Sequence, residues 1–263
     1  MTTNNYNLQQ KANIYNISFW SLLGWNYVIS GILYLVGLII TVGIINPGYA
    51  SRLMAGLTSS SHNIEYIVSA IFIQVLAGFL PILLMIYIFR EDFIGYFKDL
   101  KKRPLFYVLL TIGLFIVGLI LSGLVSILLS KIGIEGDSKN QLFLEAAIKS
   151  NAAPLVFVAA VIQAPILEEL IFRKTLFGML EKKFRLNKIV TLVIATLFFA
   201  LIHVVSELTS GDPMQMLVVL TYIPLSLILG IAYIKTENLL IPMIIHFLNN
   251  VLAFLSVVGV INV

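Results

Sequence analysis

The sequence has no cysteine and few charged residues, and both shortages restrict what the chain can be. The absence of cysteine excludes disulfides, thiol nucleophiles, cysteine-based zinc sites and S-acylation. Only 11% of the 263 residues are charged and 59% are hydrophobic, whereas an average soluble domain is about 25% charged. This composition indicates a membrane protein. The net charge of +4 does not predict nucleic acid as a partner, because the basic residues fall at the ends of apolar stretches.

Long apolar stretches dominate the chain. A bilayer core of about 30 Å requires roughly 20 apolar residues per helix. Seven stretches are long enough, at about residues 25–45, 64–89, 105–130, 153–172, 188–206, 214–234 and 239–261. We therefore expect an all-α polytopic membrane protein, a bundle of about seven transmembrane helices with short amphipathic helices at 14–25 (interfacial) and 138–150. The lipid bilayer is its first partner, and residues 1–263 form a single membrane domain.

The basic residues predict an orientation. If the seven stretches alternate in direction, thirteen of the seventeen Lys and Arg residues fall on one side. The other side holds only Arg52, Lys131, Lys139 and Lys149. Because cytoplasmic loops are enriched in Lys and Arg, we expect the N-terminus in the cytoplasm and the C-terminus outside. The same basic residues also suit anionic lipid headgroups.

Apart from residues in loops and at helix ends, few ionisable residues accompany the apolar stretches, where a charge costs at least a few kcal/mol. They are Glu168, Glu169, Arg173, His203 and His246. Glu169 and Arg173 are four residues apart, so they share a helix face and can pair. Glu168 is rotated by about 100° from Glu169 and is the carboxylate left to point into the bundle.

Two further pairs repeat the four-residue spacing. An amide at Asn250, on the same face as His246, can hold that imidazole in place or donate a hydrogen bond to an oxyanion. Phe199 shares a face with His203, and its ring is a packing support. Each feature alone has a structural explanation: a lone histidine often makes an interhelical hydrogen bond, and Glu169 with Arg173 is an ordinary ion pair. Their occurrence in order on three stretches favours a joint site.

The three strings resemble the signature of a known protease family. Glu168-Glu169-Leu170-Ile171-Phe172-Arg173, Phe199-Ala200-Leu201-Ile202-His203 and His246-Phe247-Leu248-Asn249-Asn250 are similar to the motifs of the CAAX-protease and bacteriocin-processing (CPBP, Abi) family of intramembrane endopeptidases. The resemblance covers 153–252, a CPBP-like catalytic core of four spans whose last span continues to about 261. Residues 1–152, with the variable N-terminal spans, match no specific motif.

The resemblance implies roles for these residues. Glu168 would activate the attacking water with help from His203, and His246 and Asn250 would bind the developing oxyanion or complete the polar cluster. Glu169, Arg173 and Phe199 would shape the site. Two cofactor readings stay open: Glu168, His203 and His246 suit zinc with an open water position, and a glutamate in apolar surroundings is equally a general base without metal. The sequence lacks the His-Glu-x-x-His zinc helix.

The resemblance also implies the partner, a membrane-associated peptide or protein cleaved in CAAX processing, leader or pheromone maturation, or bacteriocin self-immunity. A bacterial plasma membrane is the expected location. Two alternatives remain, a proton-coupled transporter using Glu168 and an inert scaffold, although no internal symmetry of the kind transporters show is visible. Presenilin-like chemistry is excluded because no aspartate lies in an expected span, and rhomboid-like chemistry because no Gly-x-Ser-Gly motif is present.

Overall fold

The structure is a computed structural model that describes residues 3–29, 32, 64–134, 139–149, 152–205 and 213–260. Every regular element in these ranges is helical. The helices are α1 (Thr3–Gly24), η1 (Trp25–Ile29), α4 (Ile64–Ile88), α5 (Arg90–Lys102), α6 (Pro104–Lys131), α7 (Lys139–Ile148), α8 (Ala153–Val156), η3 (Phe157–Gln163), α9 (Ala164–Glu169), η4 (Leu170–Leu176), α10 (Phe177–Lys182), α11 (Lys188–His203), η6 (Pro213–Val218), α12 (Val219–Thr236) and α13 (Leu240–Val257). Most of the expected first span, 25–45, lies outside the described residues.

Five of the described helical segments are long and apolar enough to cross a membrane. They are Ile71–Ile88, Pro104–Lys131, Ala153–Lys182, Met216–Thr236 and Leu240–Val257. The expectation of an all-α polytopic membrane protein is therefore confirmed. The fifth expected span, 188–206, forms a shorter helix, α11, which ends at His203 after 16 residues. At 1.5 Å per residue this is about 24 Å, less than a bilayer core.

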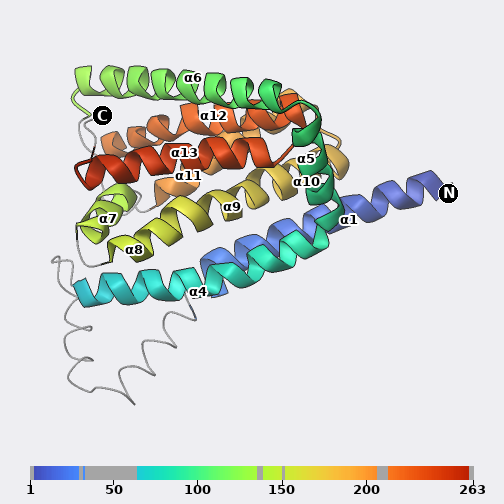
Figure 1. Ribbon diagram of the computed structural model, residues 1–263, viewed down its shortest axis with the longest axis horizontal. Helices are drawn as coiled ribbons and strands as arrows, with labels where there is room; N and C mark the ends of the chain where they lie inside the picture. The colour runs from blue at the N-terminus through green and yellow to red at the C-terminus, as the bar shows by residue number, and fades with distance from the viewer. Residues whose placement is uncertain are drawn as a thin grey trace, which may run out of the picture.

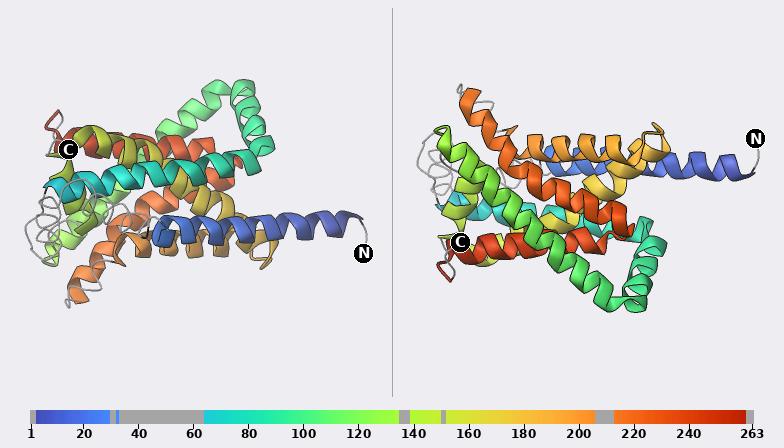
Figure 2. Two further views of the ribbon diagram at one scale, coloured as in Figure 1. Left: turned by 90° about the horizontal axis from the view of Figure 1, so that it is seen from below. Right: turned by 90° about the horizontal axis from the view of Figure 1, so that it is seen from above.

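The long helices lie side by side as a bundle, with α5 crossing one end and α7 at the other (Figures 1 and 2). The two termini lie at opposite ends (Figure 1). We expected an interfacial helix at 14–25, but α1 runs along the bundle instead of across it (Figure 2). The reason is packing, because Phe19 and Leu22 are buried against other helices in the main core.

The fourth expected span, 153–172, is longer than the sequence indicated. Five consecutive elements, α8 to α10, form one apolar helical segment, Ala153–Lys182, which we call the fourth-span helix. Hydropathy suggested an end at Arg173 and Lys174, yet these side chains are only 1% and 3% exposed. Because both cations have buried partners, the helix continues through them. Glu168 consequently lies near its middle.

The turn after the fourth-span helix brings two site residues to the same level. Asn187 caps the start of α11, and its side chain accepts a hydrogen bond from the backbone N–H of Val190 at 2.9 Å. Glu168 lies fourteen residues before Lys182, and His203 lies fifteen residues after Lys188. Each is therefore about 21–22 Å along its helix from this turn. Two helices that pack antiparallel place both residues at one depth.

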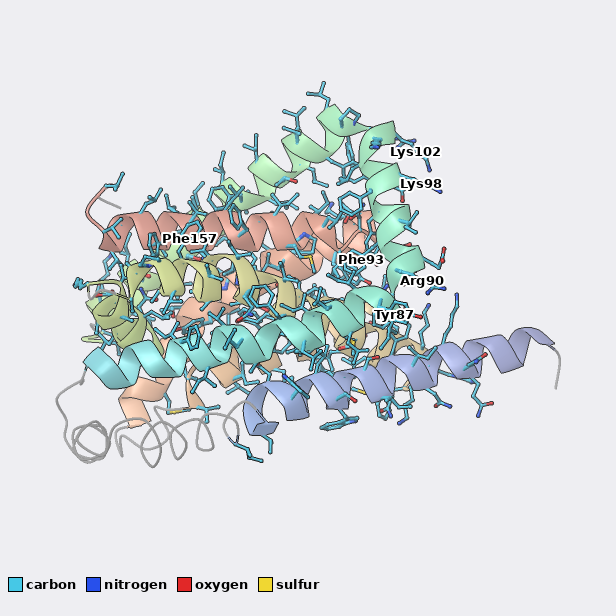
Figure 3. All side chains as sticks on the ribbon, turned by 60° about the horizontal axis from the view of Figure 1, so that its bottom comes forward. Tyr87, Arg90, Phe93, Lys98, Lys102 and Phe157 are labelled. Atoms are coloured by element: carbon cyan, nitrogen blue, oxygen red, sulfur yellow. The ribbon has the colours of Figure 1, made fainter. Side chains whose placement is uncertain are left out.

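Basic residues gather at the end of the bundle where α5 lies. Arg90, Lys98 and Lys102 lie on α5 at this end (Figure 3), and the turn from α10 to α11 lies at the same end (Figure 1). The helix α5 has Glu91 and Asp92 in its first turn and Lys101 and Lys102 in its last, which suits the helix dipole. The basic residues of α5 and the turn from α10 to α11 therefore lie at one end of the bundle, as the predicted orientation requires. The side of the membrane to which this end turns stays a prediction.

Candidate active site

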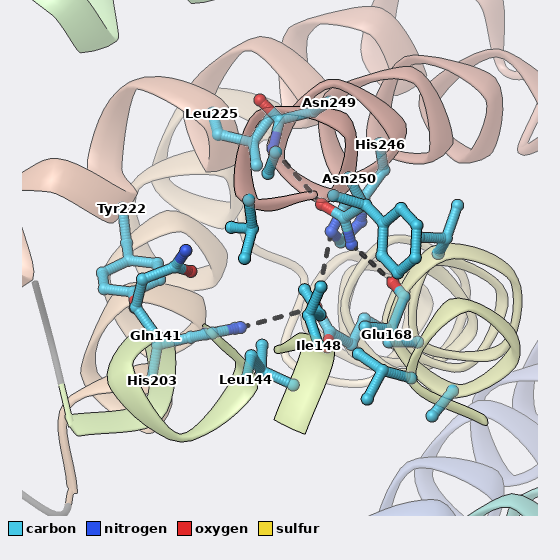
Figure 4. A pocket seen from close by; sticks show the side chains of 18 of the residues that line it. Gln141, Leu144, Ile148, Glu168, His203, Tyr222, Leu225, His246, Asn249 and Asn250 are labelled. Carbon is cyan, nitrogen blue, oxygen red and sulfur yellow. Dashed lines mark hydrogen bonds and ion pairs between the residues drawn. The ribbon is translucent and has the colours of Figure 1, made fainter. Parts of the chain in front are cut away.

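Glu168 borders a cavity of about 260 Å³ inside the bundle. The cavity extends from the middle of the fourth-span helix toward α7, and it also touches α4, α11, α12 and α13. Figure 4 shows His203 and His246, which come from different helices, turned toward Glu168. The carboxylate atom Oε2 of Glu168 is buried and has no hydrogen-bond partner. The residues that the sequence singled out thus meet at one carboxylate.

The imidazole of His203 is held in one orientation. Its Nδ1 atom lies 2.7 Å from the carbonyl oxygen of Phe199. A carbonyl only accepts hydrogen bonds, so Nδ1 carries the proton and donates. The ring lies between Phe199, at 4.4 Å between ring centroids, and Tyr222, at 4.8 Å. The other nitrogen, Nε2, faces Glu168 Oε2 at 3.6 Å.

His246 is held by Glu169 in a comparable way. Its Nδ1 atom lies 3.0 Å from Glu169 Oε1, which also accepts from Arg173 Nη1 at 2.7 Å. The carboxylate accepts, so Nδ1 of His246 donates. This leaves Nε2 of His246 facing Glu168 Oε2 at 3.8 Å. The two adjacent glutamates therefore have separate tasks: Glu169 orients an imidazole, and Glu168 faces the cavity.

Arg173 anchors this arrangement in the core. Its Nη2 atom donates to both the carbonyl and the hydroxyl oxygen of Ser226, at 3.0 and 2.9 Å. The guanidinium also lies over the ring of Phe199, 4.8 Å from its centroid. Glu169 is 0% exposed and Arg173 1%. The expected pairing of Glu169 with Arg173 is confirmed, and Ser226 is an additional partner that helical spacing gave no means to find.

Three hydrogen-bond acceptors face one another at the centre of the site. With both Nδ1 atoms donating, neutral His203 and His246 each present an Nε2 lone pair to the carboxylate oxygen of Glu168. Separations of 3.6 and 3.8 Å are too long for direct hydrogen bonds. A group that satisfies all three must carry donor protons or positive charge. A divalent cation meets this requirement for all three atoms, whereas a water molecule, which has two protons, can donate to two of them at a time.

Asn250 does not hold the imidazole of His246, so one of its two expected roles is wrong. Its Nδ2 atom donates to the carbonyl oxygen of Ala160 at 2.8 Å instead. The place beside the imidazole is taken by Glu169. Asn249 donates from Nδ2 to Oδ1 of Asn250 at 3.2 Å, and both amides line the cavity. Asn250 therefore remains in the site as a cavity-wall amide that a neighbouring amide orients.

The donor set fits zinc in its chemistry. Two imidazoles whose Nδ1 atoms donate to a carboxylate or a carbonyl are the usual form of zinc-binding histidines, and His203, His246 and Glu168 form a His₂Glu set. Within the described residues, however, no three His, Asp or Glu side chains lie close enough together to hold a metal as they stand. The set would therefore have to contract slightly around an ion.

Several residues of the site carried no signal in the sequence. Tyr222, Ser226 and Asn249 come from α12 and α13, and Gln163 belongs to the fourth-span helix. Each is uncharged, so the search for ionisable residues in apolar stretches passed over it. Asn249 alone had a visible clue, because it directly precedes Asn250 in the third motif.

Residues 150–252 match the model of a family described as type II CAAX prenyl endopeptidase Rce1-like. A curated relative, the membrane-embedded CAAX protease MroQ of Staphylococcus aureus (strain USA300), is 35% identical over 107 residues. The alignment covers 39% of this chain and 39% of the relative, so the two are similar over well under half of their lengths. No solved structure matches the chain. Glu168, His203, His246 and Asn250 all fall within the matched range.

Proposed function

Because residues 150–252 match the Rce1-like family model and resemble a staphylococcal CAAX protease, we propose that the chain is an intramembrane endopeptidase of the CAAX-protease (CPBP) family. It hydrolyses a peptide bond in a membrane-associated peptide or protein. The observation that carries the proposal is the buried Oε2 of Glu168, which faces two oriented imidazoles inside a cavity of the bundle. Such a set holds and deprotonates one water.

In the proposed mechanism, a water lies between Glu168 Oε2 and the Nε2 atom of His203, and it donates one of its two protons to each. Glu168 takes a proton from this water as its oxygen attacks the scissile carbonyl carbon. The C–O bond forms while the carbonyl electrons move to oxygen and produce an oxyanion. Glu168 then returns the proton to the amine as the C–N bond breaks. His203, fixed by Phe199, keeps the water in position.

The oxyanion is stabilised from the α13 side of the cavity. In the proposal, His246 gains a second proton from solvent before the reaction and keeps it throughout. Its Nε2–H donates to the oxyanion, and the buried carboxylate of Glu169 stabilises the imidazolium through Nδ1. The second N–H of Asn250 Nδ2 supplies a further donor, because only one is required by Ala160. Glu169 therefore has the role that the buried aspartate plays in a serine-protease triad.

The cavity suits an apolar segment of the substrate. Its wall includes Ile71, Leu144, Leu225 and Phe254, and a volume of about 260 Å³ accepts a side chain or two next to the peptide bond. The name of the staphylococcal relative supports CAAX-type processing as the first substrate class to examine. Leader or pheromone maturation and bacteriocin self-immunity are the other roles that the family suggests.

The apolar helices, the basic end and the staphylococcal relative support a proposed location. We place the protein in a bacterial plasma membrane with α5 and the N-terminus on the cytoplasmic side. The cavity then extends toward the outer side, where α7 lies. Proteolysis of inside-out and right-side-out vesicles, followed by mapping of cuts in α5, tests this placement.

The proposed function is tested with purified protein and a membrane peptide reporter. Wild type is expected to cleave it, and His203→Ala and His246→Ala are expected to lose at least about 100-fold in rate. The matched control is Ile189→Ala, because this side chain is 74% exposed and lies at the opposite end of α11 from His203. Wild-type activity in both histidine variants contradicts the proposal. Proton-coupled solute uptake without peptidase activity favours a transporter instead.

A zinc-dependent form of the same reaction is the second candidate, supported by the two Nδ1 contacts that leave both Nε2 atoms facing Glu168. Glu168, His203 and His246 would hold the ion, which when bound would acidify its water ligand. Prolonged chelation followed by zinc addition separates the candidates. Activity that falls and returns supports zinc, whereas activity that survives complete metal removal supports the glutamate base alone.

A further inference from the structure

A second cavity, of about 50 Å³, also borders Glu168. Its walls come from η1 and α4, which do not belong to the matched family range, and from the fourth-span helix. The larger cavity also touches α4 and the fourth-span helix, but its remaining walls come from α7, α11, α12 and α13. The carboxylate of Glu168 therefore has a cavity toward the C-terminal helices and another toward the N-terminal helices.

The N-terminal wall is fixed by hydrogen bonds to α4. Pro81 lies inside α4 and has no N–H, so the carbonyl of Ala77, four residues earlier, lacks its helical donor. The indole N–H of Trp25 donates to this carbonyl at 2.8 Å. This bond holds η1, with Asn26 as the next residue, against the cavity. The proline in α4 thereby positions a segment that is distant in sequence.

Gln163 forms the opposite wall and depends on a glycine. Its side chain is buried, and Nε2 donates to the carbonyl of Val75 at 2.7 Å. The amide lies directly over Gly78, where an added Cβ would come within 2.6 Å of its Cδ atom. Only glycine at position 78 leaves room for this amide, so the position of the Gln163 side chain depends on the glycine in α4.

The second cavity has the size and polarity to hold water. A buried water requires roughly 10–15 Å³ of cavity volume and two to four polar partners. About 50 Å³ therefore accepts a few molecules, with the amides of Asn26 and Gln163 and the carboxylate of Glu168 in the wall. The larger cavity would be filled by substrate during a reaction, and each hydrolysed bond consumes one water.

We propose that the second cavity holds the hydrolytic water and supplies it to Glu168, with Gln163 and Asn26 as positioning residues. The inference rests on the proposed peptidase function and assigns the N-terminal helices a part in it. Substrate approaches Glu168 from the larger cavity, and water approaches from the smaller one. Neither route then obstructs the other.

Kinetics of the full-length protein test the proposal. Gln163→Met keeps the side-chain length and removes the amide, and its kcat is expected to fall about 10- to 100-fold. KM is expected to stay within about two-fold, because substrate does not contact this cavity. Gly78→Ala is expected to act similarly by displacing Gln163, whereas its control Gly113→Ala, with open space around the added Cβ, is expected to match wild type. A wild-type kcat in Gln163→Met, or a loss that appears in KM, overturns the proposal.

A second measurement reports on water without requiring activity. The chain has two tryptophans, so Trp20→Phe, at a side chain that is 60% exposed, leaves Trp25 as the only indole emitter. Its emission is expected to rise when D₂O replaces H₂O, and Gln163→Met in this background is expected to reduce that rise. An active enzyme in which Trp25 shows no solvent effect overturns the water cavity alone. An inactive wild type with the solvent effect overturns the peptidase function, and the proposal with it.

Discussion

The buried pair of Glu169 and Arg173 gives a prediction whose size follows from the structure. Glu169 Oε1 accepts from Arg173 at 2.7 Å, and both side chains are at most 1% exposed. Removing one partner leaves the other charge buried without compensation, which typically costs about 3–5 kcal/mol. Removing both leaves neither charge of the pair without its partner. We therefore expect Glu169→Gln and Arg173→Met each to be severely destabilising and the double variant to lose less than their sum.

The size of the non-additivity can be bounded. If each single variant loses about 3–5 kcal/mol, simple addition gives about 6–10 kcal/mol for the double variant. We expect a total loss of no more than about 5 kcal/mol, which corresponds to a coupling of at least about 1–5 kcal/mol. For a chain of this size, 1 kcal/mol corresponds to roughly 2–4 °C in Tm. Single variants should therefore unfold roughly 6–20 °C below wild type.

Thermal unfolding in a mild detergent, followed by far-UV circular dichroism, measures these differences. The matched control is Lys102→Met, which breaks an exposed pair with Asp99 of similar length, 2.9 Å. Exposed pairs contribute about 0–1 kcal/mol, so the control should shift Tm by a few degrees at most. Additive losses in the double variant would refute the reasoning, because they would mean that neither charge depends on the other.

Three further outcomes follow from single contacts. Gly178→Ala would place a Cβ within 2.4 Å of the Tyr15 ring, so it should lower the free energy of unfolding by about 1–3 kcal/mol in thermal scans. The control Gly113→Ala should lower it hardly at all, and equal Tm values for the two variants would contradict this packing. Tyr222→Leu removes the ring that stacks on the imidazole of His203, and it should lower kcat up to about 10-fold in the peptide assay. An unchanged kcat would show that this stacking contact is not needed for the reaction. Asn187→Ala removes the α11 cap and should cost about 1 kcal/mol in thermal unfolding, whereas Asn187→Asp, which keeps the capping oxygen, should not.

Helical periodicity predicted the contacts within one helix and little beyond them. It paired Glu169 with Arg173 and separated Glu168 from that pair, and the structure has both features. Spacing wrongly offered Asn250 as the support of His246, because it compares only residues on the same helix. The actual support, Glu169, comes from another helix, and its distance from His246 depends on how the helices pack.

Hydropathy located the helices better than their ends. It stopped the fourth span at residue 172 because two cations follow, and it could not show that they have buried partners. Lys174, for instance, donates to the buried Tyr96 on α5 and also pairs with Asp92, which is half-exposed. The contribution of Trp25 and Asn26 to the site was also beyond sequence reasoning, because it depends on a carbonyl that a proline in another helix leaves free.

The central claim is that Glu168 activates the water that hydrolyses a peptide bond. Its most direct test is cleavage of a membrane peptide by Glu168→Gln, a variant of nearly unchanged shape that cannot accept the proton. The account predicts a rate at least about 100-fold below wild type, with unchanged binding of the uncleaved peptide and an unchanged Tm. A folded Glu168→Gln protein that cleaves at the wild-type rate would contradict it.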